Sequence, residues 1–318
     1  MSTILLPSRL RDANLAELVC RLGEANASDS MTVDFRSLSF IEPGCVVTLL
    51  AKTHRWLTEG KSVVFLNLDH CGAVQYLQRM NFFAHCGVPL EERFCRWNPS
   101  GRFVEIQRLG GDGKTVEQIS TSLATCIAPE LADTTDPDVS GLFDCVEYSL
   151  SELALNVTQH SQSQGFVMAQ YYEHRDLVCL AIADHGIGIK ESFIRTGSQH
   201  VSEAMSDLDS IRKAIELRVS SKGHLSTAWG DPINAGVGLT LLHALATEVG
   251  GMITIVSGDG AYSLGQGQVL PEKCRFNGTI CAMSFPRSRV TNFGQMLNDA
   301  KTRTGLLKSR DGFSELFQ

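Results

Sequence analysis

The chain has 318 residues and a formal net charge of −7 at pH 7. This negative balance argues against non-specific binding to nucleic acid, and no segment approaches the ~20 consecutive apolar residues of a membrane span. Ten scattered cysteines contain no C-x-x-C pair, and we recognise no signal peptide. We therefore expect reduced thiols in a cytoplasmic protein with room for two domains.

The first hundred residues alternate between strand and helix patterns. β-Branched and aromatic residues predict strands at 32–35 and 62–68, and helical periodicity predicts helices at 45–56 and 73–83. Such alternation is typical of a small α/β domain, which we place at residues 1–100.

A second, larger region follows, which we place at residues 101–287. A strand at 103–107 leads through a glycine-rich turn into a helix at 116–127. Residues 288–318 form a C-terminal tail with apolar residues at irregular spacing around charges. The tail is either a short helix that docks on the body or on a partner, or loose chain.

A helix predicted at 142–160 carries polar side chains beside its buried stripe. Its apolar residues recur at spacings of three and four: Leu142, Val146, Leu150, Leu153 and Val157. Glu152, Asn156 and His160 are spaced by four, so they share a neighbouring stripe. Asn156 suits a hydrated magnesium ion as a ligand, and Glu152 could accept a proton. An ordinary amphipathic helix with a polar flank would show the same pattern.

An apolar run at 177–183 ends on a carboxylate followed by two glycines. The run predicts a buried strand or a short buried helix. Asp184 can accept a hydrogen bond from an exocyclic amine, and Gly186 and Gly188 let the backbone approach a flat ring. A simple turn after a strand accounts for the same residues equally well.

Glycines also precede an apolar helix near position 238. Gly236, Gly238 and Leu239 open the helix, and Gly250 and Gly251 close it. Backbone N–H groups at a helix start that is approached through glycine form a general phosphate site. The alternative is a helix with an ordinary glycine-rich entry.

The last feature is a strand predicted at 276–286 that opens on Gly278-Thr279. Thr279 is placed to hydrogen-bond Asp184 or a water near the edge of a bound ring. Each of the four motifs is weak alone. Their fixed order, with the right elements between them, predicts a pocket for ATP with its magnesium ion.

The four motifs resemble the boxes of the GHKL ATPase superfamily, which includes gyrase, heat-shock chaperone, histidine kinase and mismatch-repair ATPases. The resemblance implies an α/β (α+β) fold: a Bergerat-type sandwich in which helices cover one face of a mixed sheet. A mobile lid, here residues 189–235, would cover the nucleotide. The residues that the resemblance assigns to ATP and magnesium are Asn156, Asp184, Gly186, Gly188, Gly236, Gly238, Leu239 and Thr279.

Within the superfamily, the spacing of Glu152, Asn156 and His160 is most similar to that of the anti-sigma-factor serine kinases, in which the glutamate acts as general base. This implies a Ser/Thr protein kinase that acts on a protein partner, with Glu152 as its catalytic residue. His160 either approaches the phosphates or hydrogen-bonds near the helix end.

The N-terminal region resembles the STAS fold of anti-sigma-factor antagonists over about ninety residues, and the segment at 33–44 carries the resemblance. In that family a phosphorylated serine follows the Phe-Ile strand. The matching residues here are Glu42, Pro43, Gly44 and Cys45, which have no hydroxyl group. The region is therefore not expected to be a phosphoacceptor. It either docks a partner, sits on its own ATPase domain, or is a plain accessory domain.

Three functions follow as hypotheses. The first is the Ser/Thr protein kinase, and the second is a nucleotide-gated switch or slow ATPase without kinase activity. A histidine kinase is disfavoured, because residues 101–145 supply about one helix and no histidine. We expect ATP and Mg²⁺ as cofactors and a regulatory protein partner, without nucleic acid or membrane; a homodimer stays open.

Overall fold

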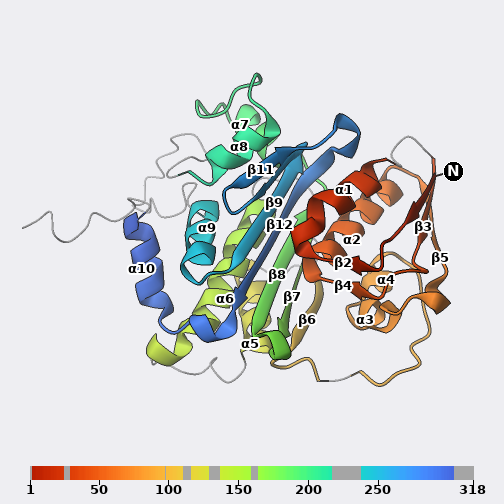
Figure 1. Ribbon diagram of the computed structural model, residues 1–318, viewed down its shortest axis with the longest axis horizontal. Helices are drawn as coiled ribbons and strands as arrows, with labels where there is room; N and C mark the ends of the chain where they lie inside the picture. Colours follow the sequence, from red (N-terminus) through yellow and green to blue (C-terminus); the bar gives the residue numbers. More distant parts are fainter. Residues whose placement is uncertain are drawn as a thin grey trace, which may run out of the picture.

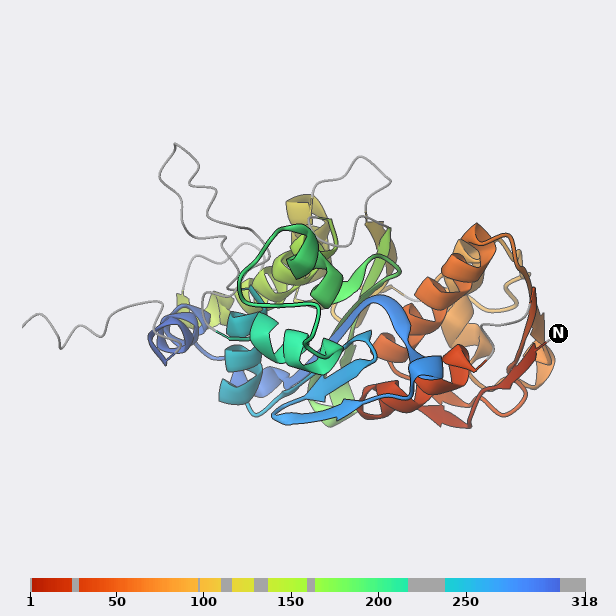
Figure 2. The ribbon, with the colours of Figure 1, turned by 90° about the horizontal axis from the view of Figure 1, so that it is seen from above.

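The protein has an α+β fold in four layers (Figure 1). The computed structural model describes residues 2–24, 29–96, 98–109, 116–128, 137–158, 164–216 and 238–303. A small parallel sheet forms one outer layer and is followed by N-terminal helices. A large antiparallel sheet comes next. Helices from residues 116–303, here called the C-terminal helices, form the other outer layer. Seen from above, the N-terminal segment (residues 2–96) lies at one end of this stack (Figure 2).

The large sheet has seven strands in the order β11-β10-β9-β12-β8-β7-β6, and every neighbouring pair is antiparallel. Its strands are β6 (Phe103–Leu109), β7 (Gly165–Tyr172), β8 (Leu177–Asp184), β9 (Met252–Gly258), β10 (Gly260–Ser263), β11 (Gln266–Val269) and β12 (Phe276–Pro286). The parallel pairs lie in two smaller sheets instead, with orders β1-β3-β5 and β2-β4. We expected parallel and antiparallel strand pairs within one mixed sheet. In the structure, they lie in separate sheets.

The strands of the small sheets are β1 (Ser2–Leu5), β2 (Arg9–Leu10), β3 (Ser30–Asp34), β4 (Phe40–Ile41) and β5 (Ser62–Leu66). Short 3-10 turns link several elements: η1 (Asp12–Asn14), η2 (Leu68–His70), η5 (Glu173–Arg175), η6 (Glu272–Cys274) and η7 (Arg287–Arg289).

Both faces of the large sheet are buried, which explains the unbroken apolar sequence of β8. Leu180 and Ile182 pack with the C-terminal helices, whereas Ala181 and Ala183 pack with the N-terminal segment. Since side chains alternate between the faces of a strand, a strand covered on both sides needs apolar residues at every position. Of the two alternatives for the apolar run at 177–183, a buried strand or a short buried helix, the structure has the strand.

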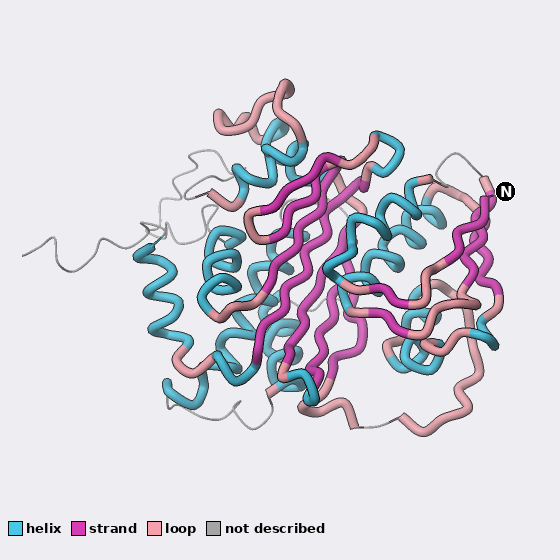
Figure 3. Tube along the Cα trace, in the orientation of Figure 1, coloured by secondary structure: helices cyan, strands magenta, loops and turns pink. Residues whose placement is uncertain are grey.

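On the first face, the part of the chain that the structure describes has helices in two tiers: three pack on the sheet and α10 (Phe293–Arg303) lies outside them, all drawn in cyan in Figure 3. The three are α5 (Val116–Ile127), α6 (Pro137–Asn156) and α9 (Gly238–Glu248). α9 ends in a Schellman motif, in which the N–H of Gly251 donates to Ala246 O at 2.7 Å and that of Gly250 to Thr247 O at 3.2 Å. α10 docks on α6 and α9, so this part of the tail follows the docked alternative.

The N-terminal segment covers the second face, chiefly through α2 (Pro43–Thr58), with α1 (Leu15–Gly23) beside it. Every residue of α2 from Pro43 to Thr53 is buried, because the helix lies between the small sheet and the large one. Gly44 stands so close to β12 that a Cβ there would lie 2.8 Å from Ala282 Cβ. One hydrophobic cluster runs from the N-terminal segment to this face. The segment therefore sits on the C-terminal part of its own chain.

The start of α2 is capped by a residue distant in sequence. The Asp12 carboxylate accepts hydrogen bonds from the N–H groups of Gly44 at 3.1 Å and Cys45 at 3.0 Å. Glu42 accepts from the N–H of Asp12 at 2.9 Å and pairs with Arg175, which precedes β8, at 3.1 Å. Burial, with the nearby Glu42 carboxylate, raises the pKa of Asp12 to about 7. The segment matched to the STAS phosphorylation site is thus a buried helix start.

The helix predicted at 73–83 is divided in two, and in this respect the prediction was wrong. α3 (Val74–Arg79) ends before Met80, and α4 (Phe82–His85) begins after Asn81. Asn81 has φ 63°, in the left-handed region where asparagine is tolerated better than most residues. That conformation breaks the helical path, although the apolar spacing continues across it.

The first part of the expected lid is helical and packs on the sheet. α7 (Gly188–Arg195) contacts β9 and β12, and α8 (Asp207–Ala214) contacts β10. Asp207 accepts a hydrogen bond from Asp259 N–H at 3.1 Å and pairs with Arg275 at 2.8 Å. Residues 217–235 lie outside the described residues. Among the described residues, no helix is both long and apolar enough to cross a membrane.

Candidate functional site

The turn after β8 is organised around the carboxylate of Asp184. Its Oδ1 accepts a hydrogen bond from the N–H of Gly186 at 2.7 Å, and the N–H of Thr279 also donates to the carboxylate. The side chain is buried, and the loss of solvation raises its pKa to about 7 in spite of the two donors. Thr279 thus does contact Asp184, through its backbone.

Two glycines have no room for a side chain here: Gly188 after β8, and Gly278 in β12, which packs against this turn. Gly278 has φ 125°, and a Cβ there would overlap the backbone oxygen of Asp184. Gly188 has φ 79°, and a Cβ there would lie 2.8 Å from Ser257 Oγ. Both backbone angles favour glycine. The close approach holds the turn after β8 against the start of the Gly278-Thr279 motif.

Ser257 joins the two motifs, and the sequence analysis did not identify it. Its Oγ accepts a hydrogen bond from the N–H of Ile189 at 2.9 Å and donates to Gly278 O at 3.0 Å. The residue is buried in β9, an otherwise largely apolar strand. A serine inside such a strand was the available signal, because a buried hydroxyl needs hydrogen-bond partners.

On the first face of the sheet, Glu152 of α6 meets the start of α9. A Cβ at Gly238 would overlap the Glu152 carboxylate, so the two motifs are in direct contact. Glu152 is half-buried, and this burial raises the pKa of its carboxyl group. A carboxylate with a raised pKa accepts protons more readily near neutral pH.

The end of α6 reaches the end of β8. Val157 packs on Gly165, where a Cβ would come within 2.6 Å of its Cγ1, and Gly165 is the cross-strand partner of Asp184. Asn156 is the last residue of α6 and is half-buried. Val157 and Thr158 continue in a wider π-type turn, a feature that is frequent at functional sites.

The structure therefore brings most of the sequence-predicted residues to one end of the large sheet. Leu239 is partly buried between the main core and a small cluster formed by α7 and its neighbours. Gly236 and His160 lie outside the described residues. Among the described residues, no group of three or more His, Cys, Asp or Glu side chains could hold a metal ion. A magnesium ion that takes one amide oxygen, phosphate oxygens and water does not need such a group.

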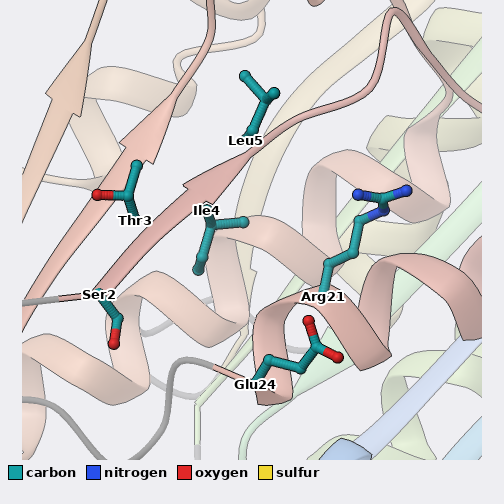
Figure 4. A pocket seen from close by; sticks show the side chains of 6 residues that line it. All are labelled: Ser2, Thr3, Ile4, Leu5, Arg21 and Glu24. Carbon is teal, nitrogen blue, oxygen red and sulfur yellow. The ribbon is translucent and has the colours of Figure 1, made fainter.

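A separate hollow of about 290 Å³ lies between β1 and α1 (Figure 4). Its two charged side chains already have partners: Arg21 pairs with Glu17 at 2.8 Å, and Glu24 pairs with Lys273 at 2.9 Å. None of the predicted site residues lines it. The hollow therefore adds nothing to the candidate site.

Compared with models of protein families, the chain matches none, and a search among curated proteins finds no match either. The site must therefore be judged on its own geometry.

Proposed function

We propose that the chain binds ATP with Mg²⁺ between the end of α6 and the turn after β8, as a GHKL-type regulatory ATPase. Asp184 would accept a hydrogen bond from the adenine amino group, and Gly186 and Gly188 would face the ring. Asn156 would bind the magnesium ion, and Gly238 at the start of α9 would lie near the phosphates, together with Gly236.

One observation carries the proposal: the buried carboxylate of Asp184 at a turn built from close-packed glycines. Burial of a carboxyl group costs free energy, and strongly perturbed pKa values are frequent at functional sites. The contact between Glu152 and Gly238 supports the proposal further. It brings a carboxylate that can accept a proton to the end of the pocket where the phosphates of ATP are expected.

The reaction that this arrangement supports best is transfer of the γ-phosphoryl group to a serine or threonine of a protein partner. Glu152 would accept the hydroxyl proton, while magnesium and backbone N–H groups would neutralise the phosphate charge. The phosphoacceptor would lie on another protein, because the N-terminal segment has no hydroxyl at the matching position and buries it.

Replacement of Asp184 tests the binding step. Asp184→Ala removes the acceptor and leaves donors unpaired, at a cost of about 1–3 kcal/mol, or roughly ten- to hundredfold in ATP affinity. Calorimetry with ATP and with adenosine measures the loss, and removal of magnesium should weaken only ATP. Asp34→Ala is a matched control, because Asp34 is a buried carboxylate at the end of another strand, β3. Equal ATP affinity in wild type and Asp184→Ala would refute the assignment.

A further inference from the structure

α2 is tied to β8 near both ends of that strand. At its start, Glu42 pairs with Arg175, which lies just before β8. Twelve residues further along the chain, His54 and Arg55 contact His185, the residue directly after β8. The 16 residues of α2 span about 24 Å at 1.5 Å per residue. The 8 residues of β8 span about 26 Å at 3.3 Å per residue, so the two elements are similar in length. α2 therefore runs along β8 and ends beside the candidate nucleotide turn.

Two contacts hold His185. Arg55 Nη1 donates a hydrogen bond to the backbone oxygen of His185 at 3.2 Å, and the Nε of Arg55 also pairs with Glu59, which fixes the guanidinium. Nδ1 of His54 lies 3.2 Å from Nε2 of His185, and the two rings stack with centroids 5.3 Å apart at 23°. The His54 ring also meets the Phe166 ring edge-on at 5.5 Å.

His185 lies between Asp184 and Gly186, and the sequence pattern suggested no role for it. Its backbone is one bond removed from the residue whose carboxylate would contact adenine. Because Asp184 also accepts from Gly186 N–H, a shift of His185 displaces donor and acceptor together. A contact on His185 therefore acts on the shape of the whole turn.

The histidine pair holds only while at least one ring is neutral, because a hydrogen bond between two ring nitrogens needs one donor and one acceptor. The titratable and charged side chains around the pair are Arg55 on α2, Glu59 directly after α2, Arg108 on β6, His85 on α4 and Asp184 on β8. Burial, followed by Arg108 and His85, lowers the pKa of His54; burial, followed by His54, lowers that of His185. Both rings are therefore neutral at pH 7, and acid breaks the pair.

We propose that His54 and Arg55 are positioning residues for the nucleotide site, which hold the turn after β8 through the side chain and backbone of His185. The N-terminal segment then serves the site as a fixed support. It does not act as a detachable arm, because α2 is buried from Pro43 to Thr53. The effect on ATP rests on the proposed function, whereas the effect on the turn itself does not.

Backbone hydrogen exchange at residues 185–189 of the unliganded full chain tests the support directly. Arg55→Met keeps the aliphatic stem and loses the donor, so exchange should become about three- to tenfold faster. His54→Phe keeps the ring contacts but loses the hydrogen bond, with about two- to fivefold faster exchange. Arg21→Met is the matched control, because Arg21 also pairs with a glutamate four residues away. In the Arg21→Met variant, the backbone amides of residues 185–189 should exchange at the wild-type rate.

The pH dependence adds a readout that general destabilisation would not change. After correction for intrinsic exchange, protection of residues 185–189 in wild type should fall as the pH is lowered below about 6.5, the ordinary pKa of histidine, and less steeply in His54→Phe. ATP affinity should also fall in both variants, by a factor set by the fraction of molecules that still hold the turn in its binding-competent shape. Unchanged exchange in Arg55→Met and His54→Phe would overturn the inference. If wild type failed to bind ATP, the proposed function would be refuted, and exchange alone would decide whether α2 supports the turn.

Discussion

α2 and α6 lie on opposite faces of the same sheet, and they differ in which of their residues are buried. α2 is buried on all sides from Pro43 to Thr53, including the polar Thr48 and Lys52. α6 buries one stripe and leaves Glu152 and Asn156 half-buried at its rim. A helix packed between two sheets has no accessible edge for polar functional side chains. A helix that is covered on one side only has such an edge. The difference predicts that substitutions on the two faces affect different properties.

The largest expected effect is on the α6 side. Glu152→Gln keeps the shape of the side chain but cannot take a proton near neutral pH, so phosphoryl transfer or hydrolysis should fall by about 10²–10⁴-fold. Because phosphoryl transfer depends mostly on positioning and charge neutralisation, the smaller figure is the safer one. Labelled ATP with cell extract measures transfer, and calorimetry should find ATP affinity retained.

The wild-type reaction must be observed first. If wild type neither hydrolyses ATP nor labels any protein, Glu152 has no catalytic role. A nucleotide-gated switch would then replace the kinase as the proposed function.

On the α2 side, a substitution in the core away from His54 and Arg55 should affect stability alone. Phe35 is fully buried and packs on the rings of Phe65, Phe82 and Phe83. Phe35→Ala should cost about 3–5 kcal/mol in the free energy of unfolding. Since one hydrophobic cluster joins Phe35 to the large sheet, denaturant should unfold both parts in a single shifted transition. Separate transitions would contradict a shared core, and the folded variant should bind ATP normally.

Ser257 tests the connection between the motifs and should show a smaller effect. Ser257→Ala leaves the N–H of Ile189 and the oxygen of Gly278 without their shared partner, at about 1–3 kcal/mol. We expect a loss of both stability and ATP affinity. Ser263→Ala in the neighbouring strand β10 is a suitable control. If only stability falls, Ser257 supports the sheet and not the site.

The smallest expected effect comes from the titration of Asp184. With its pKa raised to about 7, the carboxylate needed to accept from adenine forms only above that pH, so adenosine affinity should rise about tenfold from pH 6 to pH 8. Adenosine has no phosphate to titrate, which isolates the effect. The unliganded protein should show the opposite trend. Its folded state binds this proton more tightly than the unfolded chain, so stability falls as pH rises from about 4 to 7. Asp184→Asn should remove the trend in adenosine affinity and reduce the trend in stability, to which Asp12, with its pKa also raised to about 7, contributes as well.

The elements with a strong local pattern could be predicted from the sequence. The helix predicted at 116–127 coincides with α5, and the apolar run at 177–183 with β8. Glu152 and Gly238 were singled out separately, and the structure places them in contact. These residues lie in motifs where spacing along the chain determines which face or end of an element they occupy.

The remaining features depend on contacts between distant residues. His54 meets His185 131 residues later, and Asp12 caps a helix that begins 31 positions beyond it. Ser257 lies in a strand with no motif around it. Such contacts leave no periodic signal, because the partners are brought together only when the layers pack. The sequence did not reveal that α2 is buried on both sides, because that burial also depends on how the layers pack.

The position of α2 between the two sheets also has a consequence for synthesis of the protein on the ribosome. α2 ends at Thr58, whereas β12, which covers part of it, ends at Pro286. Roughly 230 residues must be made in between, which takes on the order of 10–50 s at about 5–20 residues per second. During that interval the growing chain carries an apolar helix without its final cover. A chaperone that holds nascent chains should therefore improve the yield of this protein more than that of one whose N-terminal domain folds alone.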